Sequence, residues 1–571
     1  MSRPNGRPLL LACAVGLLAA ACAGENEVSF DTAGSGGSTG GHTTGGSGAG
    51  GSGAAGGGGY SAQASAFFGV PNVDDDDGNG NVDWGQGLFP QDNEPAQLVL
   101  PPELVAAVSP SDTIELTLSG ETDSVIFWRN GDIALGYAGG NGILSSLTLG
   151  GAEAATASFL VDFKTFHREV GLHIRHLDAS AHELATYDVD LWGSPLVLNH
   201  QLQPTEQVWV VQGWNNQSMI QVLQQLLGAR LTTISNSDSG GDIWVQDQLE
   251  WATATAPGKR MDVAMNSIRN RPLRDWVQTL KAPDLQPMTW GQPGTDLTED
   301  KFGNLETTPP LTVGGVAYPF GRIYYGDDGA GTGPTAVLKN FLAEQQLQAP
   351  IAVDTSWLCI GHVDEFLAFI PDPSSPKGFK LLCADVNAAY AILDALDPAT
   401  ALPRYASDYG YATVGQLVGD STLRAYNQDV QIDYVDPIRS ALMATLELGE
   451  SDLLRVPSVW ERMSSCPYSS GHMEALALTP GMVNLAVVNV DGDPLRLIIA
   501  DPFLRPSGAA QASDPFVQAF TASLPAGTEP HFVDDWNDYH LSWGEVHCGT
   551  NVQRTPTAQW WTDGMHLLGG N

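Results

Sequence analysis

Apolar and polar residues alternate along the first part of the chain that has a folding pattern. Ile114, Leu116 and Leu118 alternate with polar residues, and the apolar run 125–128 leads into an Asn-Gly pair at 130–131, which favours a hairpin turn. Several such segments follow one another up to about residue 198. They predict an antiparallel β-sandwich domain over residues 63–204.

The pattern changes at about residue 205. The run 208–211 is apolar throughout and predicts a buried strand, and apolar residues from Met219 to Leu227 then follow at helical spacing. Gly228 is suited to end this helix. Because strand and helix patterns alternate from here onward, residues 205–571 are expected to form one large mixed α/β domain.

The first 62 residues have a different character. Residues 1–22 carry two arginines, a short apolar run and three alanines before Cys22, which is typical of an export signal and too short to span a bilayer. The alanines and Cys22 resemble the lipobox of bacterial lipoproteins, in which this cysteine is diacylated; secretion with cleavage near Cys22 is the alternative. Residues 23–62, dominated by Gly, Ser, Ala and Thr, predict a flexible linker. We therefore expect an outer-membrane lipoprotein or an extracellular protein that contacts a membrane only through its lipid anchor.

The composition adds a strong negative charge. The chain has 65 Asp and Glu against 26 Lys and Arg, a formal net charge of −39. Phosphate binding requires basic patches, so nucleic acid is not an expected partner. The charge favours cationic ligands, either metal ions or substrates with guanidinium or ammonium groups. A solvated acidic surface, as in many exported bacterial proteins, is the alternative.

An acidic loop opens the predicted sandwich domain. Residues 72–83 alternate Asp and Asn and include glycines, a pattern that can wrap oxygen ligands around Ca²⁺. One ligand register consists of Asp75, Asp77, Asn79, Gly80 and Asp83, and another of Asn72, Asp74 and Asp76. The glutamate-bearing helix of an EF-hand is missing, so the loop would act alone; a solvated acidic turn is the alternative.

The six cysteines form no disulfide scaffold and no zinc pattern, although one disulfide pair is possible. Cys359 and Cys383 lie in apolar runs and are expected in the core. Cys548 stands between Gly544 and Gly549 with polar neighbours, which core packing explains poorly. It is a candidate nucleophile, with a small buried hydrophobe as the alternative.

Carboxylates are embedded in apolar and aromatic sequence at 243–251 and 357–366. Buried carboxylates are unfavourable unless they are protonated, bound to metal or paired with a cation. Two carboxylates can hold a flat guanidinium through paired N–H groups. A thiolate can then attack its central carbon, a histidine can protonate the departing amine, and water can release the product. These residues predict hydrolysis of a guanidine to a urea with loss of ammonia.

The same stretches resemble the protein-arginine deiminases, Ca²⁺-dependent enzymes that convert arginine residues of proteins to citrulline. The resemblance runs from about Asp190 to Trp561 and rests on the motifs Trp-Val-Gln-Asp (244–247), Phe-Gly-Asn-Leu-Glu (302–306), 357–366 and 544–554. It implies a five-bladed, pseudo-symmetric α/β-propeller preceded by one immunoglobulin-like β-sandwich domain. It also implies a nucleophile, a general acid/base and two guanidinium ligands, which are Cys548, His362, Asp247 and Asp364.

The resemblance assigns further roles at the substrate. Trp244 would pack along the aliphatic stem of the substrate arginine, and Arg269 and Arg271 would contact the peptide backbone. Ser542 replaces a substrate-contacting arginine of the family, so peptide preference is expected to differ. His547, beside the nucleophile, is expected to be a structural hydrogen-bonding residue rather than a second base.

Calcium ligands are implied in the same way. One site in the catalytic domain would use side chains or backbone carbonyls of Gln246, Glu250, Phe302, Leu305 and Glu306. A second site has Gln248 and Asn266 where the family has carboxylates. Because two negative charges are lost, we expect one strong calcium site here and one that is weak or absent.

Together these observations predict calcium-dependent hydrolysis of peptidyl-arginine to peptidyl-citrulline and ammonia, through a thiouronium intermediate on Cys548. Arginine-containing proteins or peptides are the expected partners. The alternatives are a hydrolase of free arginine or agmatine and a catalytically silent, calcium-dependent protein that binds arginine-rich surfaces.

Overall fold

The computed structural model describes residues 65–88, 93–294, 300–329, 333–464, 466 and 473–569. These residues belong to one compact unit of the chain. The predicted export signal (1–22) and linker (23–62) lie outside the described residues. Within the described part, no helix combines the length and the apolar character needed to cross a lipid bilayer.

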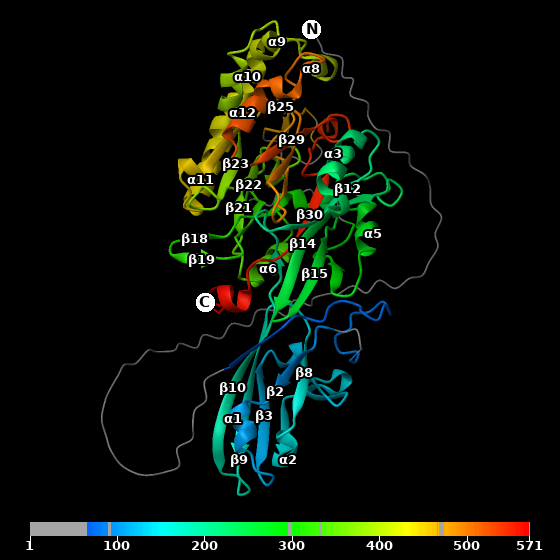
Figure 1. Cartoon of the computed structure of the whole chain (residues 1–571), viewed down its shortest axis with the longest axis vertical. Helices are drawn as coiled ribbons and strands as arrows, with labels where there is room; N and C mark the ends of the chain where they lie inside the picture. The colour runs from blue at the N-terminus through cyan, green and yellow to red at the C-terminus, as the bar shows by residue number, and fades with distance from the viewer. Residues whose placement is uncertain are drawn as a thin grey trace, which may run out of the picture. The chain divides into compact units, whose positions relative to one another are not determined.

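Two five-stranded sheets make up the first folded part (Figure 1). One sheet has the order β1 (Ser65–Gly69), β10 (Glu183–Gly193), β9 (Arg168–Leu177), β3 (Thr113–Gly120) and β7 (Ser146–Gly150). The other has the order β2 (Ala96–Val99), β8 (Ser158–Phe163), β4 (Val125–Arg129), β5 (Asp132–Tyr137) and β6 (Ile143–Leu144). All neighbouring strands are antiparallel except β1 and β10. Two short helices, α1 (Pro102–Ala107) and α2 (Gly151–Ala154), connect strands.

The side chains of this part follow the alternation in the sequence. Ile114, Leu116 and Leu118 on β3 are buried in a core that both sheets share. Asn130 and Gly131 link β4 to β5 with positive φ angles of 54° and 88°, as the hairpin pattern predicted. β-Strands are thus correctly predicted here, while the immunoglobulin-like topology stays a prediction.

A short strand before the predicted boundary at residue 204 already pairs with the α/β region. The strand β11 (Val197–Leu198) pairs with β14 (Leu249–Ala256), which is the strand that follows one of the acidic motifs. A two-residue strand carries no readable periodicity, so the sequence carried no sign of it. The domain boundary itself stays a prediction.

One pattern of strand pairing occurs five times in the α/β region. In each sheet a central strand pairs antiparallel with one neighbour and parallel with the other. The sheets are β30 (Thr550–Arg554)–β12 (Thr205–Val211)–β13 (Leu231–Ile234), β14–β15 (Lys259–Asn266)–β16 (Leu285–Met288), β17 (Leu305–Thr307)–β20 (Ile323–Gly326)–β21 (Ile351–Val353), β22 (Leu367–Pro371)–β23 (Phe379–Asp385)–β24 (Leu453–Pro457) and β27 (Ala486–Val488)–β28 (Arg496–Ala500)–β29 (Glu529–Val533). Two hairpins, β18 (Leu311–Val313)–β19 (Val316–Tyr318) and β25 (Trp460–Arg462)–β26 (Ala475–Ala477), are additional.

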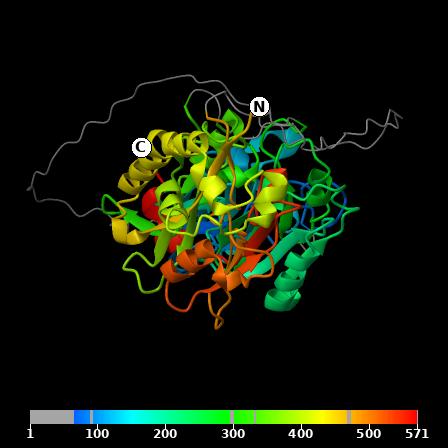
Figure 2. The ribbon, with the colours of Figure 1, turned by 90° about the horizontal axis from the view of Figure 1, so that it is seen from above.

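A helical segment connects the two parallel strands of each sheet, which is how parallel strands are joined. The connecting helices are α3 (Gln217–Leu227), α5 (Leu273–Gln278), α6 (Ala336–Glu344) and α12 (Pro515–Ser523), and in the fourth sheet α7 (Val386–Leu393), α8 (Pro403–Asp408), α9 (Val414–Gly419), α10 (Ser421–Val430) and α11 (Asp436–Thr445). The last five are yellow-green to yellow in Figure 1 and lie in front in the view from above in Figure 2. The mixed α/β class is confirmed; the closed five-bladed arrangement stays a prediction.

Local sequence explains these helices. Met219, Leu223 and Leu227 of α3 are buried, and the helix ends at Gly228 with a φ of 55°, as predicted.

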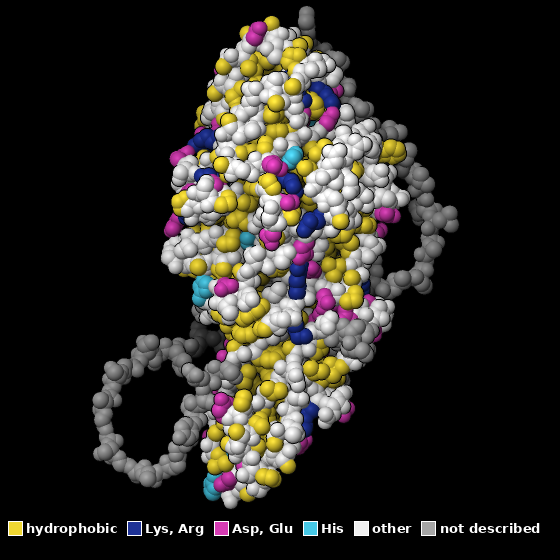
Figure 3. Space-filling view, in the orientation of Figure 1, with side chains coloured by type: hydrophobic (Ala, Val, Ile, Leu, Met, Phe, Trp, Pro, Cys, Tyr) yellow, Lys and Arg dark blue, Asp and Glu magenta, His cyan; other side chains and the backbone are white. Residues whose placement is uncertain are grey.

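On the surface shown in Figure 3, Lys and Arg side chains lie mostly beside Asp and Glu. Arg260 is an example elsewhere in the described chain, because it forms ion pairs with Glu206 and Asp262 at 2.6 and 2.8 Å.

The two cysteines predicted to lie in the core differ from each other. Cys383, on β23, is a buried free thiol, as predicted. Cys359 is buried too, but it forms a disulfide with Cys466. The prediction of Cys359 as a simple core residue was incomplete, because an apolar setting reports burial and says nothing of a partner distant in the sequence.

Candidate active site

The predicted catalytic residues stand at equivalent places in the repeated sheets. Asp247 lies in a single helical turn, α4 (Val245–Gln248), directly before β14, and Asp364 lies in a 3₁₀ turn (Val363–Glu365) shortly before β22. Cys548 precedes β30 by two residues. Each therefore occupies the turn that enters the strand paired antiparallel with the central strand of its sheet, and the repeat brings these turns to one place.

The other two sheets contribute residues from the same position. Asn484 precedes β27, and its side-chain Nδ2 lies 3.2 Å from both Cys548 Sγ and the carbonyl oxygen of Asp364. Its Oδ1 accepts the backbone N–H of Cys548 at 3.1 Å. Gly303, in a 3₁₀ turn before β17, lies against the site through its backbone. Sequence reasoning missed both residues, since an isolated amide and a glycine carry no chemical signature.

Distances within the site show two contacting pairs. Cys548 Sγ is 3.5 Å from Asp364 Oδ2, and His362 Nδ1 is 3.6 Å from Asp247 Oδ1. The backbone of Gly303 lies close to one residue of each pair, His362 and Asp364. A Cβ built on Gly303 would lie 2.7 Å from His362 Nδ1 and 3.1 and 3.2 Å from the carboxylate oxygens of Asp364. The four predicted catalytic residues thus form one chain of contacts through Gly303, and each residue is at most 8% exposed.

The electrostatics of this point favour a cation. Burial raises the pKa of the Cys548 thiol well above its ordinary value of 9.0, and the negative charges of Asp364 and Asp247 raise it further. The thiol is therefore neutral while the carboxylates have no cation between them. A guanidinium held by the two carboxylates would offset their charge and so favour the thiolate.

Trp244 borders the site, as predicted. A Cβ on Gly544 would lie 2.5 Å from the indole ring and 3.3 Å from Cys548 Cβ, so the ring lies against the backbone of the cysteine motif. Tyr539 packs edge-on against the same ring, with 5.6 Å between ring centroids. Trp244 is partly exposed.

The two predicted peptide-contacting arginines differ. Arg269 is 2% exposed, and it donates to Asp242 Oδ1 at 3.2 Å and to the carbonyl of Trp244 at 3.3 Å. In this structure its guanidinium supports the segment that carries Trp244 and Asp247. Arg271 is exposed, and its contact with peptide stays a prediction.

His547 has the hydrogen-bonding role that the sequence predicted. Its Nδ1 is 2.9 Å from Asp364 Oδ2, and its Nε2 is 3.5 Å from Glu306 Oε1. Burial alone would lower the pKa of His547, but Glu306 and Asp364 outweigh it and raise the pKa to about 9. The histidine is therefore a cation at neutral pH and links the catalytic carboxylate to the predicted calcium ligands.

Those ligands lie together next to the catalytic residues. Gln246 Nε2 is 2.6 Å from Glu250 Oε2 and 3.2 Å from the carbonyl oxygen of Phe302. Burial and the charge of Glu306 raise the pKa of Glu250 to about 8, and burial is the main cause that raises the pKa of Glu306 to about 7. Leu305 follows Phe302 and begins β17. The buried Glu306, the partly buried Glu250 and the carbonyl of Phe302 are oxygen ligands of the kind that suits a hard divalent cation.

The second predicted calcium site has a different composition. Gln248 Nε2 donates to Asn266 Oδ1 at 2.7 Å and to the carbonyl of Ser267 at 2.9 Å. Asn266 Nδ2 donates in turn to the carbonyl of Arg274 at 3.1 Å. Donor N–H groups thus occupy the space between the oxygens. Both amides are buried and hydrogen-bonded to each other, an arrangement that does not need a cation.

The acidic loop forms two carboxylate clusters. One consists of Asp75, Asp77 and Asp83, in the predicted register, and the other of Asp74, Asp76 and Glu94. Asn79, another predicted ligand, donates its amide to Asp77 Oδ2 at 2.9 Å and is exposed. The structure places Asp284, from the α/β region, at the second cluster, with its N–H 3.0 Å from Asp74 Oδ2.

Glu94 was not predicted, because no ligand pattern surrounds it in the sequence. It is 1% exposed, and its Oε1 has no hydrogen-bond partner. Burial, and then the charge of Asp74, raise its pKa to about 10; burial and the charge of Asp76 raise the pKa of Asp74 to about 7. Buried carboxylate oxygens that lack donors and repel one another fit a bound divalent cation.

Comparisons with known proteins agree with the motifs. Residues 183–562 match the family model of protein-arginine deiminase (PAD). The rat protein-arginine deiminase type-4 is 32% identical over 391 residues, which cover 64% of this chain and 55% of the relative. The human type-3 enzyme is 30% identical over 400 residues, covering 67% and 58%. The chain therefore spans about half the length of these relatives. A solved agmatine deiminase from C. jejuni covers 64% of this chain and 98% of its own, at 9% identity and a TM-score of 0.36, too low to support an argument.

Proposed function

Because the chain belongs to the protein-arginine deiminase family, we propose that it hydrolyses the guanidinium group of arginine residues in proteins or peptides, leaving citrulline and releasing ammonia. The observation that carries the proposal is the meeting of a thiol, a histidine and two carboxylates around the backbone of Gly303. The names of the curated relatives favour a protein substrate.

Substrate binding is the task of Asp247 and Asp364. Their carboxylates accept the paired N–H groups of the flat guanidinium and hold its central carbon facing Cys548. Trp244 lies along the aliphatic stem. The substrate brings a further positive charge between the two carboxylates, which favours the Cys548 thiolate. The thiol proton passes to His362, which holds it for the departing ammonia.

The reaction then has two halves. In the first, Cys548 Sγ forms a bond to the guanidinium carbon, the carbon–nitrogen bond breaks, and His362 gives a proton to the departing ammonia. This leaves a thiouronium on Cys548. In the second, His362 takes a proton from water, the water oxygen attacks the same carbon, and the carbon–sulfur bond breaks to release citrulline. Asn484 Nδ2, 3.2 Å from Sγ, stabilises the thiolate in both halves.

Calcium is part of the proposal. Gln246 and Glu250, with Glu306 and the carbonyls of Phe302 and Leu305, would hold one ion beside the catalytic residues. Turning the Gln246 amide by half would direct its Oε1 at this site and its Nε2 at Asn551. The Asn551 amide would have to turn too, so that its Oδ1, which is buried without a hydrogen-bond partner, accepts this Nε2. The bound ion would supply positive charge that keeps the neighbouring carboxylates ionised and ordered. The two acidic-loop clusters would bind further ions between the sandwich and the α/β region.

The architecture and location complete the proposal. The five equivalent sheets, each of which places one turn at the site, support a five-bladed pseudo-symmetric propeller. The two-sheet domain before it is proposed to be immunoglobulin-like. The sequence before residue 63 supports export as a lipoprotein or as a secreted protein. Hydrolysis of free arginine or agmatine is the competing activity, and Ser542, in place of a family arginine, gives reason to test it.

Citrulline formation tests the function directly. The purified chain is assayed with an arginine-containing peptide, a blocked arginine ester and free arginine, in calcium and in chelator. We expect calcium-dependent citrulline from the peptide and the ester, abolition in Cys548→Ser, and wild-type rates in Cys383→Ala, which removes a buried thiol elsewhere. A preference for free arginine would replace the protein-substrate proposal. No citrulline from any of the three would refute the enzyme.

A further inference from the structure

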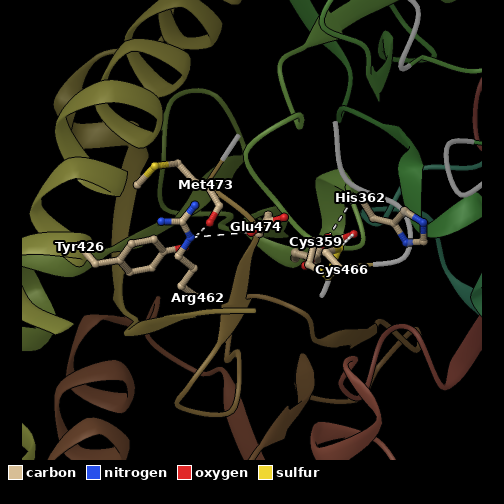
Figure 4. Close-up of a disulfide and its surroundings, with 8 residues drawn as sticks. Cys359, His362, Tyr426, Arg462, Cys466, Met473 and Glu474 are labelled. Carbon is tan, nitrogen blue, oxygen red and sulfur yellow. Dashed lines mark hydrogen bonds and ion pairs between the residues drawn. A yellow bond between two sulfur atoms is a disulfide. The ribbon is translucent and has the colours of Figure 1, made fainter. Parts of the chain in front are cut away.

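A disulfide joins Cys359 to Cys466 beside the segment that carries two catalytic residues (Figure 4). The backbone on either side of Cys359 is already attached to β26, because the Cys359 N–H donates to the Ala475 carbonyl at 2.8 Å and the Ala475 N–H donates to the Trp357 carbonyl at 2.9 Å. Cys466 lies in the connection between β25 and β26. The disulfide is thus a covalent attachment between the catalytic segment and this hairpin.

The path from the disulfide to the catalytic histidine is short and turned. Gly361, with a φ of 87°, is in the left-handed region that favours glycine and redirects the chain between Cys359 and His362. Glu365 fixes the turn, since its Oε1 accepts the backbone N–H of His362 at 2.8 Å. Figure 4 shows the disulfide next to the backbone that leads to His362. A displacement of Cys359 would therefore be transmitted to the histidine.

His362 stands between two points at which the catalytic segment is attached. Its Nδ1 faces Asp247, at 3.6 Å from Oδ1. On the other side, Asn484 holds the carbonyl of Asp364. The catalytic segment is thus held at Asp364 by a hydrogen bond and at Cys359 by a covalent bond, with His362 between them.

We propose that the Cys359–Cys466 disulfide positions His362 and Asp364, so that the chain with this bond formed is the fully active enzyme and the dithiol form is impaired. The proposal rests on the deiminase function proposed above. A dithiol reductant breaks the S–S bond by giving two electrons and two protons, which makes two S–H groups and a cyclic disulfide of the reductant.

The enzyme would then need one cysteine pair oxidised while Cys548 stays reduced. Its structure permits both states together, because Cys548 is only 5% exposed and is protonated in the resting site. Oxidants react with exposed thiolates first. An exported enzyme made in a reducing cytoplasm would reach full activity only after export, when the disulfide forms.

Any disulfide stabilises the folded state by restricting the unfolded chain. Variants can therefore distinguish a role of the Cys359–Cys466 disulfide in positioning His362 and Asp364 from a role in stability alone. The double variant Cys359→Ser/Cys466→Ser is compared with the wild type and with Cys383→Ala in kcat, KM and thermal unfolding. Because small displacements of catalytic groups reduce turnover steeply, we expect kcat to fall by about 10- to 100-fold. KM should rise as well, because Asp364 also holds the substrate guanidinium. An unchanged kcat, whatever the melting temperature, would overturn the proposal.

A dithiol provides a second comparison. Treating the wild type should lower kcat, and reoxidation should restore it, whereas the double variant should not respond. Equal responses would show that the dithiol acts elsewhere, which would also overturn the proposal.

An alkylation experiment keeps this inference distinct from the proposed function. Chloroacetamidine carries an amidinium that Asp247 and Asp364 can hold, and chloroacetamide is its neutral counterpart. The ratio of their alkylation rates at Cys548, followed by mass spectrometry, reports how the carboxylates are placed even if no citrulline forms. We expect the double variant to show a ratio lowered by about tenfold. A ratio equal to that of the wild type would refute the positioning role.

Discussion

Replacing Gly303 by alanine tests the geometry of the site through a single methyl group. The added Cβ would lie 2.7 Å from His362 Nδ1, whereas ordinary contacts begin at 3.4 Å, so the histidine or the glycine backbone must move by about 0.7 Å. The carboxylate oxygens of Asp364, at 3.1 and 3.2 Å, leave no room on the other side. Displacements near 1 Å reduce catalysis by about 100-fold, and we expect a loss of this order in kcat.

The matched control is Gly419→Ala, at the end of α9, where an added Cβ meets nothing within 4 Å. Both variants are compared in peptide citrullination and in thermal unfolding. Overpacking a buried site destabilises by about 1–3 kcal/mol, so Gly303→Ala should melt at a lower temperature but remain folded. A folded Gly303→Ala enzyme with wild-type kcat would mean that the catalytic groups do not converge on this point, and the mechanism above would be wrong.

Three further outcomes follow from the charges of the structure. Asp364→Asn removes a carboxylate that raises the pKa of Cys548, so iodoacetamide should alkylate this thiol faster at pH 8. Citrullination should fall by about 100-fold or more, because a guanidinium ligand is lost. Slower alkylation would contradict the assignment of Asp364. In the chelated protein, the raised pKa of Glu94 contributes stability that is fully present below pH 4.5, which is the pKa of this group in the unfolded chain. This contribution is lost as the pH rises towards 10. In chelator, the free energy of unfolding should therefore fall by at most about 1.4 kcal/mol per pH unit between pH 6 and pH 9, and the melting temperature should fall with it. Glu94→Gln should flatten this pH profile. An unchanged profile in the variant would show that Glu94 does not titrate this way. Calorimetry should show one bound calcium fewer in Glu306→Gln and an unchanged number in Gln248→Ala, and an equal loss in both would mean that the amide pair binds metal.

The sequence indicated most of the candidate site, because the candidate catalytic residues lie in short motifs with unusual composition. Carboxylates within aromatic runs are visible without a fold, and so is a cysteine between glycines. Asn484 and Glu94 could not be found in this way. Each is a single polar residue whose importance comes from what the fold places beside it, and local sequence carries no trace of that neighbour.

For the fold, too, local features could be predicted from the sequence and contacts between distant segments could not. Strand alternation and the helix of residues 217–227 were predicted from periodicity, which is a local property. The fivefold repeat of strand pairing was not visible as periodicity, because its sheets differ in strand length and the fourth contains the helices from Val386 to Thr445. The partner of Cys359 was equally hidden, since its disulfide bridges 107 positions of sequence.

Strand β30 carries a consequence for how the protein is made. It follows every other described strand in the chain, yet it completes the sheet begun by β12, the first strand of the repeat. Cys548 stands at its entrance. A nascent chain that has been synthesised only to a point before residue 548 thus lacks both the candidate nucleophile and the strand that completes the earliest sheet. On the proposed mechanism, activity requires that synthesis has passed β30.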